Sequence, residues 1–119
     1  MDDLQVLQTE FSKNEFEAKK ILVTGASGFI ASHVADSLSK RGHKVYLYDL
    51  KKSKYLQKNQ KMIIGNIQDK KKINKISKKI DIIYHFAATA DLHQANKLPQ
   101  ETINNNIIGT LNILNACVK

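Results

Sequence analysis

The stretch that most constrains the fold is residues 21–33, Ile-Leu-Val-Thr-Gly-Ala-Ser-Gly-Phe-Ile-Ala-Ser-His. Its first four residues are apolar or β-branched, as in a buried strand, and two glycines three positions apart follow at once. Ile30, Val34 and Leu38 then recur at the spacing of one helix face. A strand that passes through a glycine turn into a helix predicts an α/β fold, because alternating strands and helices build parallel sheets.

The two glycines suit a turn that holds an anion. Gly25 lets the chain turn tightly off the strand, and Gly28 has no side chain, so a pyrophosphate can approach the backbone. The helix that opens there directs free N–H groups and its positive dipole end at that anion. Ala31 stands at the third position of this dinucleotide-binding pattern, where the residue serves helix–strand packing and alanine is accepted. A plain strand–helix turn could carry the same glycine pair, so the interpretation depends on residues further along.

Three more strands are indicated by short apolar runs. We expect the first helix to end near Arg41, with Gly42 as its stop signal. The runs that follow predict strands at residues 45–48, 62–64 and 82–86.

Two further helices separate or follow these strands. Asp69 is a candidate N-cap for a lysine-rich helix that turns Ile73, Ile76 and Ile80 toward the core. Pro99 begins the last helix, at a position where a missing N–H costs nothing. Apolar side chains recur every three or four residues along this helix and predict one amphipathic stripe: Ile103, Ile107, Leu111, Leu114 and Val118.

These elements predict a Rossmann-type α/β domain, with a parallel sheet, helices on both faces and the first four strands only, in the order 3-2-1-4. Strands 1 and 4 then lie side by side, and the glycine turn faces Ala87 and Ala88 across the switch point where such sheets bind ligands. We place this incomplete domain at residues 19–119. Residues 1–18 are expected to be an N-terminal extension, either a docked helix or a frayed arm.

Asp49 closes the second predicted strand, 24 residues after Gly25. An acidic side chain at this place accepts hydrogen bonds from the ribose hydroxyls of adenosine and would repel a 2′-phosphate. An aspartate that only ends a strand is the alternative, but the register with the glycine turn favours the ribose contact. Asp49 therefore predicts NAD rather than NADP, although Lys51 and Lys52 lie close enough in sequence to soften the discrimination.

The charge of the chain raises a different class of ligand. Nineteen basic and eleven acidic residues give a formal net charge of +8, yet Arg41 is the only arginine. Bidentate recognition of bases favours arginine, and no aromatic residues are interleaved with the lysines for stacking. We interpret the charge as a solvated lysine surface and expect no nucleic-acid partner.

Cellular location and metal binding follow from a few residues. No apolar run is long enough to span a membrane, and the opening Met1-Asp2-Asp3 does not have the pattern of a signal peptide. One cysteine forbids an internal disulfide and suits a reducing compartment, so we expect a cytoplasmic protein with no membrane partner. His85 and His93 have no cysteine or carboxylate set to complete a metal site, and none is assigned.

Five motifs in order give the chain its resemblance to a known family: residues 24–33, 48–50, 65–69, 85–88 and 105–114. In this order and spacing the chain, from Lys20 to its end, resembles the extended short-chain dehydrogenase/reductases. Within them it is most similar to the NAD-dependent nucleotide-sugar epimerases and dehydratases, of which UDP-glucose 4-epimerase is the closest type.

The resemblance implies how one end of NAD would be held. Backbone N–H groups of the turn and the helix start would hold the pyrophosphate, and the residues concerned are Gly25, Gly28, Phe29 and Ile30. Asp49 would take the adenosine ribose. Each of these roles comes from the family and is carried onto the matching residue.

The resemblance also implies contacts for the rest of the cofactor. Asn66 and Ile67 would flank the adenine, where asparagine replaces the family's usual aspartate and gives up a charge-assisted hydrogen bond. Asn106 would help to position the loop after strand 4 near the nicotinamide ribose. The middle of the cofactor would lie against three residues after strand 4: Phe86, Ala87 and Ala88.

No catalytic residue is assigned, because the family's Tyr-x-x-x-Lys pair lies beyond the fourth strand. Tyr48 and Lys52 have that spacing, but they fall at the adenosine end. We therefore expect the amino-terminal, NAD-binding part of a longer nucleotide-sugar epimerase or dehydratase. The full-length enzyme would take a nucleotide sugar as its substrate, and a homodimer is a possible assembly. The alternatives are a non-catalytic dinucleotide-binding module and an NAD(P)-dependent reductase of the same fold.

Overall fold

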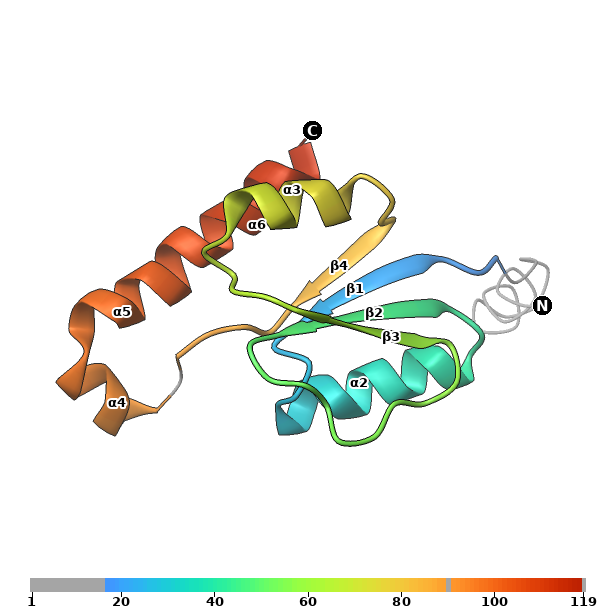
Figure 1. Ribbon diagram of the computed structural model, residues 1–119, viewed down its shortest axis with the longest axis horizontal. Coiled ribbons are helices and arrows are strands. Elements are labelled where there is room, and N and C mark those ends of the chain that lie inside the picture. The colour runs from blue at the N-terminus through green and yellow to red at the C-terminus, as the bar shows by residue number, and fades with distance from the viewer. Residues whose placement is uncertain (1–16, 90, 119) are drawn as a thin grey trace, which may run out of the picture.

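One parallel sheet organises the chain, for which a computed structural model describes residues 17–89 and 91–118 (Figure 1). Its strands are β1 (Lys20–Thr24), β2 (Lys44–Asp49), β3 (Gln60–Ile64) and β4 (Ile82–His85). They lie in the order β3-β2-β1-β4, which confirms the predicted order 3-2-1-4. The proposed N-terminal extension falls, apart from residues 17 and 18, outside the described residues.

The register of the strands brings their carboxyl ends to one edge of the sheet. Thr24, the last residue of β1, pairs with Tyr48 of β2 and with His85 of β4. Asp49, the last residue of β2, pairs with Ile64 of β3. The segments that leave the strands at this carboxyl edge are residues 25–28, 50–51, 65–69 and 86–89.

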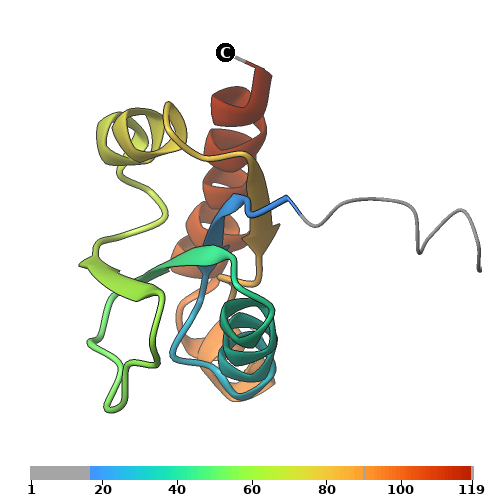
Figure 2. The same cartoon turned by 90° about the vertical axis from the view of Figure 1, so that its right-hand side faces the viewer.

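Helix α2 (Phe29–Lys40) covers one face of the sheet (Figures 1 and 2). Its small residues allow close approach to β1 and β2, and the buried cluster between them comprises Ile21, Val23, Ala26, Ala31, Ala35, Val45 and Leu47. The helix ends as predicted, with Arg41 as its C-cap. Gly42 has a φ of 97° and donates its N–H to the Ser39 carbonyl at 3.0 Å, which is the left-handed stop that glycine allows.

Helices α3 (Lys70–Ser77) and α6 (Gly109–Val118) cover the opposite face (Figure 1). The Asp69 side chain accepts the N–H of Lys72 at 3.1 Å, so the predicted N-cap is confirmed. Ile73 and Ile76 are buried as expected, whereas Ile80 lies past the end of α3 and packs against the same cluster from the loop. The cluster buried on this face comprises Leu22, Tyr48, Ile67, Ile73, Ile76, Ile113 and Ala116.

The last helical region differs from its prediction in two ways. A short helix, α4 (Leu92–Lys97), precedes it without having been expected. The region that begins at Pro99 is also not one regular helix, because α5 (Pro99–Ile103) and α6 are joined by the π-helical segment η1 (Asn104–Ile108). In η1 the Gly109 N–H reaches back five residues to the Asn104 carbonyl.

The apolar stripe of this region does not face the sheet. Helix α6 instead buries Gly109, Asn112, Ile113 and Ala116. The stripe residues Ile103, Ile107, Leu111, Leu114 and Val118 are 46%, 61%, 47%, 58% and 82% exposed. Leu111, Leu114 and Val118 lie within the regular helix α6 itself, so periodicity located a stripe there but could not tell which side of the helix is buried.

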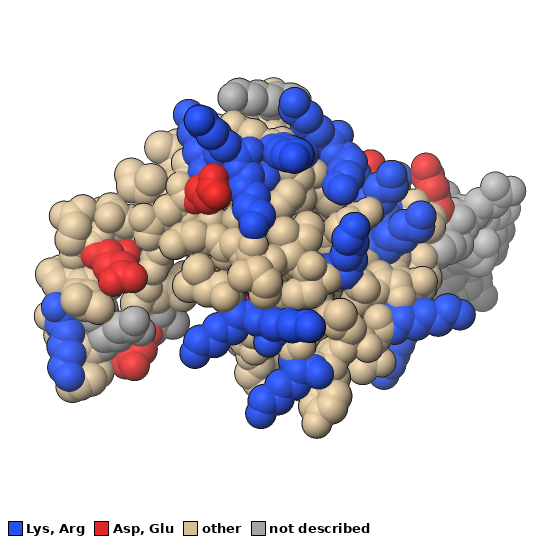
Figure 3. Space-filling model, in the orientation of Figure 1, with Lys and Arg blue, Asp and Glu red and all other residues tan. Residues whose placement is uncertain are grey.

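Lysine and arginine side chains are spread over the face shown in Figure 3, above α3 and also along the sheet. On this face the basic side chains lie over several elements rather than in one dense patch. Across residues 17–89 and 91–118, the helices are all too short or too polar to cross a bilayer.

Candidate functional site

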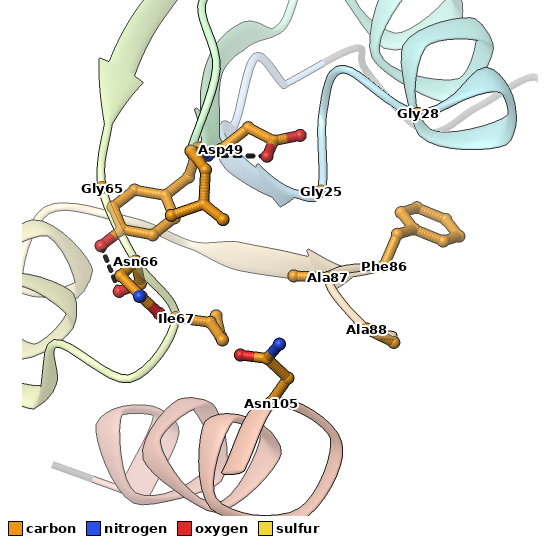
Figure 4. A pocket seen from close by; sticks show the side chains of 12 residues that line it. Gly25, Gly28, Asp49, Gly65, Asn66, Ile67, Phe86, Ala87, Ala88 and Asn105 are labelled. Atoms are coloured by element: carbon orange, nitrogen blue, oxygen red, sulfur yellow. Dashed lines mark hydrogen bonds between the residues drawn. The ribbon is translucent and has the colours of Figure 1, made fainter. Parts of the chain in front are cut away.

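A cavity of about 260 Å³ lies at the carboxyl edge of the sheet, between the ends of β1, β2 and β4 (Figure 4). The predicted site residues that line it are Gly25, Gly28, Asp49, Asn66, Ile67, Phe86, Ala87 and Ala88. Of the other predicted residues, Phe29 and Ile30 are 79% and 66% exposed in the first turn of α2. Asn106 lies beside the cavity and contacts the loop after β4.

The glycine turn forms the wall between β1 and β4. Gly25 has a φ of +67°, and a Cβ at this position would come within 2.8 Å of the Ala87 nitrogen. Only glycine therefore lets the turn lie this close to the end of β4. This close approach brings the backbone of the glycine turn against the loop after β4, at the switch point between β1 and β4.

The N–H groups of the turn are not equally available to a ligand. The Gly25 N–H donates to the Tyr48 carbonyl at 2.9 Å, and the Gly28 N–H donates to the Gly25 carbonyl at 3.0 Å. The N–H groups of Phe29 and Ile30 belong to the first turn of α2, where no carbonyl of a preceding helical turn is present to accept them. The helix start therefore offers donors to an anion, while Gly28 contributes the absence of a side chain.

Asp49 links the end of β2 to this turn. One carboxylate oxygen accepts the Ser27 N–H at 2.9 Å, and the other accepts the Leu50 N–H at 2.6 Å. Each oxygen has a second lone pair. The carboxylate is thus held in place by the backbone and can still accept hydrogen bonds from a ligand.

Tyr48 supports the wall on the β3 side. Its hydroxyl donates to the Asn66 carbonyl at 2.8 Å, and its ring is almost wholly buried. Burial, with a smaller contribution from the Asp69 carboxylate, raises the pKa of Tyr48 to about 12. Gly65 lies against the Tyr48 hydroxyl, where a Cβ would overlap it. Tyr48 is thus a neutral hydrogen-bond donor, and its hydroxyl is already used within the protein.

The segment after β3 is shaped by its own side chains and by α6. Asn66 Oδ1 accepts the Gln68 N–H at 2.9 Å, which closes a turn. The Ile67 carbonyl accepts a hydrogen bond from Asn112 Nδ2 at 3.1 Å. Gly109 packs directly on the Ile67 side chain, since a Cβ there would lie 2.7 Å from Ile67 Cγ2. Two α6 residues without an obvious ligand role therefore position a predicted site residue.

Two asparagines of η1 hold the loop after β4. Asn106 accepts the Thr89 N–H at 2.6 Å and donates to the Thr89 carbonyl at 3.0 Å. Asn105 donates to Thr89 Oγ1 at 3.0 Å and accepts from Gln68 Nε2 at 2.8 Å. The two side chains thus connect the segments after β3 and β4.

The cavity has four lining residues that the sequence did not predict: Tyr48, Leu50, Gly65 and Asn105. Gly65 and Asn105 fall inside quoted motifs, and Asn105 adjoins the predicted Asn106, so their positions carried a usable signal. Tyr48 and Leu50 also fall inside a quoted motif, residues 48–50, on either side of the predicted Asp49.

The arrangement is suited to binding and offers little acid–base chemistry. Tyr48 donates to a carbonyl and Lys52 is exposed, so this pair forms no tyrosine–lysine dyad. Within the described residues, His, Cys, Asp and Glu side chains form no group of three that could hold a metal ion.

Comparisons with known proteins agree with this fold. The model of the NAD dependent epimerase/dehydratase family matches residues 21–119. UDP-N-acetyl-alpha-D-glucosaminuronate decarboxylase of Bacillus cytotoxicus is 38% identical over 107 residues, which cover 85% of this chain and 33% of that protein. UDP-glucose 4-epimerase of Lactobacillus helveticus is 33% identical over 102 residues, which cover 82% of this chain and 31% of that protein.

Solved structures show the same likeness. UDP-glucose 4-epimerase from Thermotoga maritima, solved with UDP-glucose, has a TM-score of 0.74 and 33% identity, over 82% of this chain and 33% of that one. UDP-glucose 4-epimerase from Brucella ovis, solved in complex with NAD, has a TM-score of 0.72 and 31% identity, over 84% of this chain and 32% of that one. The chain thus spans about a third of the length of these proteins. All five motifs fall inside residues 21–119, and the chain belongs to the NAD-dependent epimerase/dehydratase family.

Proposed function

We propose that this chain binds NAD along the carboxyl edge of its sheet, as the cofactor-binding part of a nucleotide-sugar epimerase or dehydratase. The observation that carries the proposal is the cavity lined together by the glycine turn, Asp49 and residues 86–88. Family membership supports NAD as the dinucleotide, and NAD is bound in the solved epimerase of Brucella ovis.

The residues present fit the cofactor at its anionic part. The pyrophosphate would lie over the start of α2, against Gly25 and Gly28. Its oxygens would accept hydrogen bonds from the N–H groups of Phe29 and Ile30. Asp49, held by two backbone N–H groups, would accept the ribose hydroxyls of the adenosine.

The remaining walls fit the other parts of the cofactor. Asn66 and Ile67 would flank the adenine. The middle of NAD would lie against Phe86, Ala87 and Ala88, and Asn106 would hold the loop that follows them through Thr89. When bound, NAD supplies a hydride acceptor, and the role of these residues is to bind and orient it.

Nucleotide sugars enter the proposal through the relatives, which include UDP-glucose 4-epimerases. Hydride removal from a sugar carbon needs a base for the hydroxyl proton. Among the described tyrosines, Tyr48 donates to the Asn66 carbonyl and Tyr55 is exposed on the connection after β2. Tyr46 in β2 and Tyr84 in β4 pack against the two core clusters. The base and the sugar site would therefore come from sequence that the relatives have outside the region shared with this chain.

The test is a calorimetric titration of NAD into the 119-residue chain. We expect saturable binding of NAD and no epimer or reduced nicotinamide when UDP-glucose is added. Gly28→Glu should abolish NAD binding, because a carboxylate would face the pyrophosphate at the helix start. Ser37→Glu adds the same charge to an exposed position of α2 and should bind NAD normally. Absence of NAD binding by the folded wild-type chain would overturn the proposal.

A further inference from the structure

His85 uses both of its ring nitrogens, and neither contacts the cavity. Nδ1 lies 2.7 Å from Thr24 Oγ1, at the end of β1. Nε2 lies 3.0 Å from Thr110 Oγ1, at the start of α6. The imidazole thus bridges the sheet and the last helical region, directly before the loop of residues 86–89.

The hydrogen bonds of Thr24 determine the state of Nδ1. Thr24 Oγ1 accepts the Phe86 N–H at 3.0 Å and the Ala87 N–H at 3.2 Å. A hydroxyl oxygen has two lone pairs and one proton, so both lone pairs are used by these amides. The Thr24 proton must then be donated to His85 Nδ1, which therefore carries no hydrogen.

The hydrogen bonds of Thr110 determine the state of Nε2 in the same way. Thr110 Oγ1 donates its proton to the Asn106 carbonyl at 2.7 Å. Toward His85 this oxygen can then act only as an acceptor, so Nε2 carries the hydrogen. Thr24 leaves Nδ1 without hydrogen and Thr110 requires hydrogen on Nε2, so the two threonines together require the neutral Nε2–H tautomer of His85.

The bridge joins two clamps on one loop. At its start, Thr24 holds the N–H groups of Phe86 and Ala87, and this backbone lies against Gly25. At its end, Asn106 holds both the N–H and the carbonyl of Thr89. The chain of hydrogen bonds from Thr24 through His85 and Thr110 to Asn106 therefore connects the two ends of the loop of residues 86–89.

We propose that His85 is a positioning residue, whose neutral Nε2–H imidazole ties these two clamps into one unit and fixes residues 86–89 against the glycine turn. The effect on cofactor affinity rests on the proposed function, whereas the tautomer and the rigidity of the loop do not. Burial lowers the pKa of His85, which supports a neutral ring near pH 7.

The surroundings of the ring add no charge that would oppose this state. On β1 the charged residue is Lys20, at the other end of the strand, and η1 and α6 contain no Asp, Glu, Lys or Arg. The lysines of α3 are exposed or, for Lys72, turned to the Ile64 carbonyl. Titratable groups on the elements around the ring also include Tyr84, beside it in β4, and Cys117, near the far end of α6.

The first experiment observes the ring itself. Nitrogen and carbon chemical shifts of labelled wild-type protein at pH 7 should show His85 as the Nε2–H tautomer. A ring with hydrogen on Nδ1, or a doubly protonated ring, would overturn the proposal whether or not the chain binds NAD.

The second experiment breaks the link without touching the cavity. Thr110→Val removes the acceptor of the His85 Nε2–H, and Thr110→Ser restores a hydroxyl at the same place. We expect Thr110→Val to speed amide exchange at Ala87 and Thr89 and to weaken NAD binding about fivefold, the scale of one net hydrogen bond. Thr110→Ser should return both values close to wild type.

The outcomes separate this proposal from the proposed function. If the wild-type chain binds no NAD but Thr110→Val still speeds exchange at Ala87 and Thr89, the proposed function fails and the positioning role stands. If Thr110→Val binds NAD and protects these amides as Thr110→Ser does, the positioning role fails. His43→Gln is the matched control, because the Nδ1 of His43 likewise accepts a hydrogen bond, here from the Lys19 N–H at the amino end of β2. It should change neither value.

Discussion

Asp49 combines two tasks in one side chain. Its oxygens accept the N–H groups of Ser27 and Leu50, which orients the carboxylate before any ligand arrives. The same orientation directs its remaining lone pairs to the cavity that it lines. A negative charge fixed in this place favours ribose hydroxyls and disfavours a phosphate on the ribose.

The first prediction concerns the choice of dinucleotide. The wild-type chain should bind NAD more tightly than NADP. Asp49→Asn should weaken NAD binding by about 1–3 kcal/mol, because charged hydrogen bonds to the ribose are lost. The same variant should also narrow the difference in affinity between NAD and NADP. Calorimetric titration of both cofactors measures this. Asp81→Asn is the control, since Asp81 also accepts a backbone N–H, from Lys20, at the opposite edge of the sheet. Tighter binding of NADP by the wild type would contradict the role given to Asp49.

A second prediction at this scale concerns alkaline pH. Because the folded protein raises the pKa of Tyr48 to about 12 from an ordinary 10.0, the folded state holds its proton more tightly than the unfolded state. The free energy of unfolding should therefore fall as the pH rises from about 10 toward 12. Denaturant unfolding across this range should show the fall in wild type.

Variants of two tyrosines isolate this effect. Tyr48→Phe should remove the alkaline loss that Tyr48 contributes. At pH 7 it should cost about 1 kcal/mol, because the Asn66 carbonyl loses its donor. Tyr55→Phe, at a hydroxyl on an exposed side chain, should behave as wild type. An unchanged alkaline profile in Tyr48→Phe would show that another group titrates.

At the scale of elements, α6 is shaped by what it supports. It turns Gly109 and Asn112 toward Ile67, so a glycine contact and an amide hydrogen bond hold the segment after β3. Glycine in a helix normally lowers its stability relative to alanine. Here the missing side chain is required by the close approach of Ile67.

The third prediction follows from this requirement for glycine at position 109. Gly109→Ala should destabilise the protein by about 1–3 kcal/mol, as overpacking does, although alanine is the better helix former. Thermal or denaturant unfolding measures the loss. Leu114→Ala, at an exposed position of the same helix, should change stability by less than about 0.5 kcal/mol. A gain in stability for Gly109→Ala would mean that Ile67 moves aside freely.

These elements also show where sequence reasoning succeeds. The strand order, the Asp69 cap and the Gly42 stop followed from local signals, because each depends on a few neighbouring residues. The cavity gathers most of the predicted site residues for the same reason, since strand ends and glycine turns can be located locally.

The failures involve contacts between distant segments. The stripe from Ile103 to Val118 was assigned by a helical period, but α6 packs through its other side, with Gly109, Asn112, Ile113 and Ala116. The bridge of His85 to Thr24 and Thr110 joins residues 61 and 25 positions apart, and no local pattern announces such a contact. Periodicity describes a helix, whereas its buried side is decided by what packs against it.

At the scale of the whole molecule, apolar surface remains uncovered on one side. Strand β4 is the last strand in the described sheet order, next to β1 only. The stripe on α5, η1 and α6 is largely exposed. An open strand edge and exposed apolar side chains both reduce the stability gained on folding and invite association.

The fourth prediction is therefore a modest thermal stability. The 119-residue chain should unfold below about 65 °C, the upper part of the range for mesophile domains. Calorimetry with size-exclusion chromatography would measure the unfolding temperature and the association state together. A monomeric and cooperative transition above that temperature would contradict the prediction. Saturating NAD should raise the unfolding temperature, since a ligand of the folded state stabilises it by mass action.

The π turn of η1 has a consequence for insertions and deletions. Each helical residue turns the chain by about 100°, so removing one residue from this turn would rotate all of α6 about its axis by that angle. Thr110, Ile113, Leu114 and Cys117 would then occupy the inward places of Gly109, Asn112, Ile113 and Ala116. The buried side of the altered helix would be more apolar. It would, however, lose the glycine that makes room for the Ile67 side chain and the Asn112 amide that donates to the Ile67 carbonyl. Deleting a single codon in η1 would thus change α6 from a helix that supports the segment after β3 into one that only fills the core.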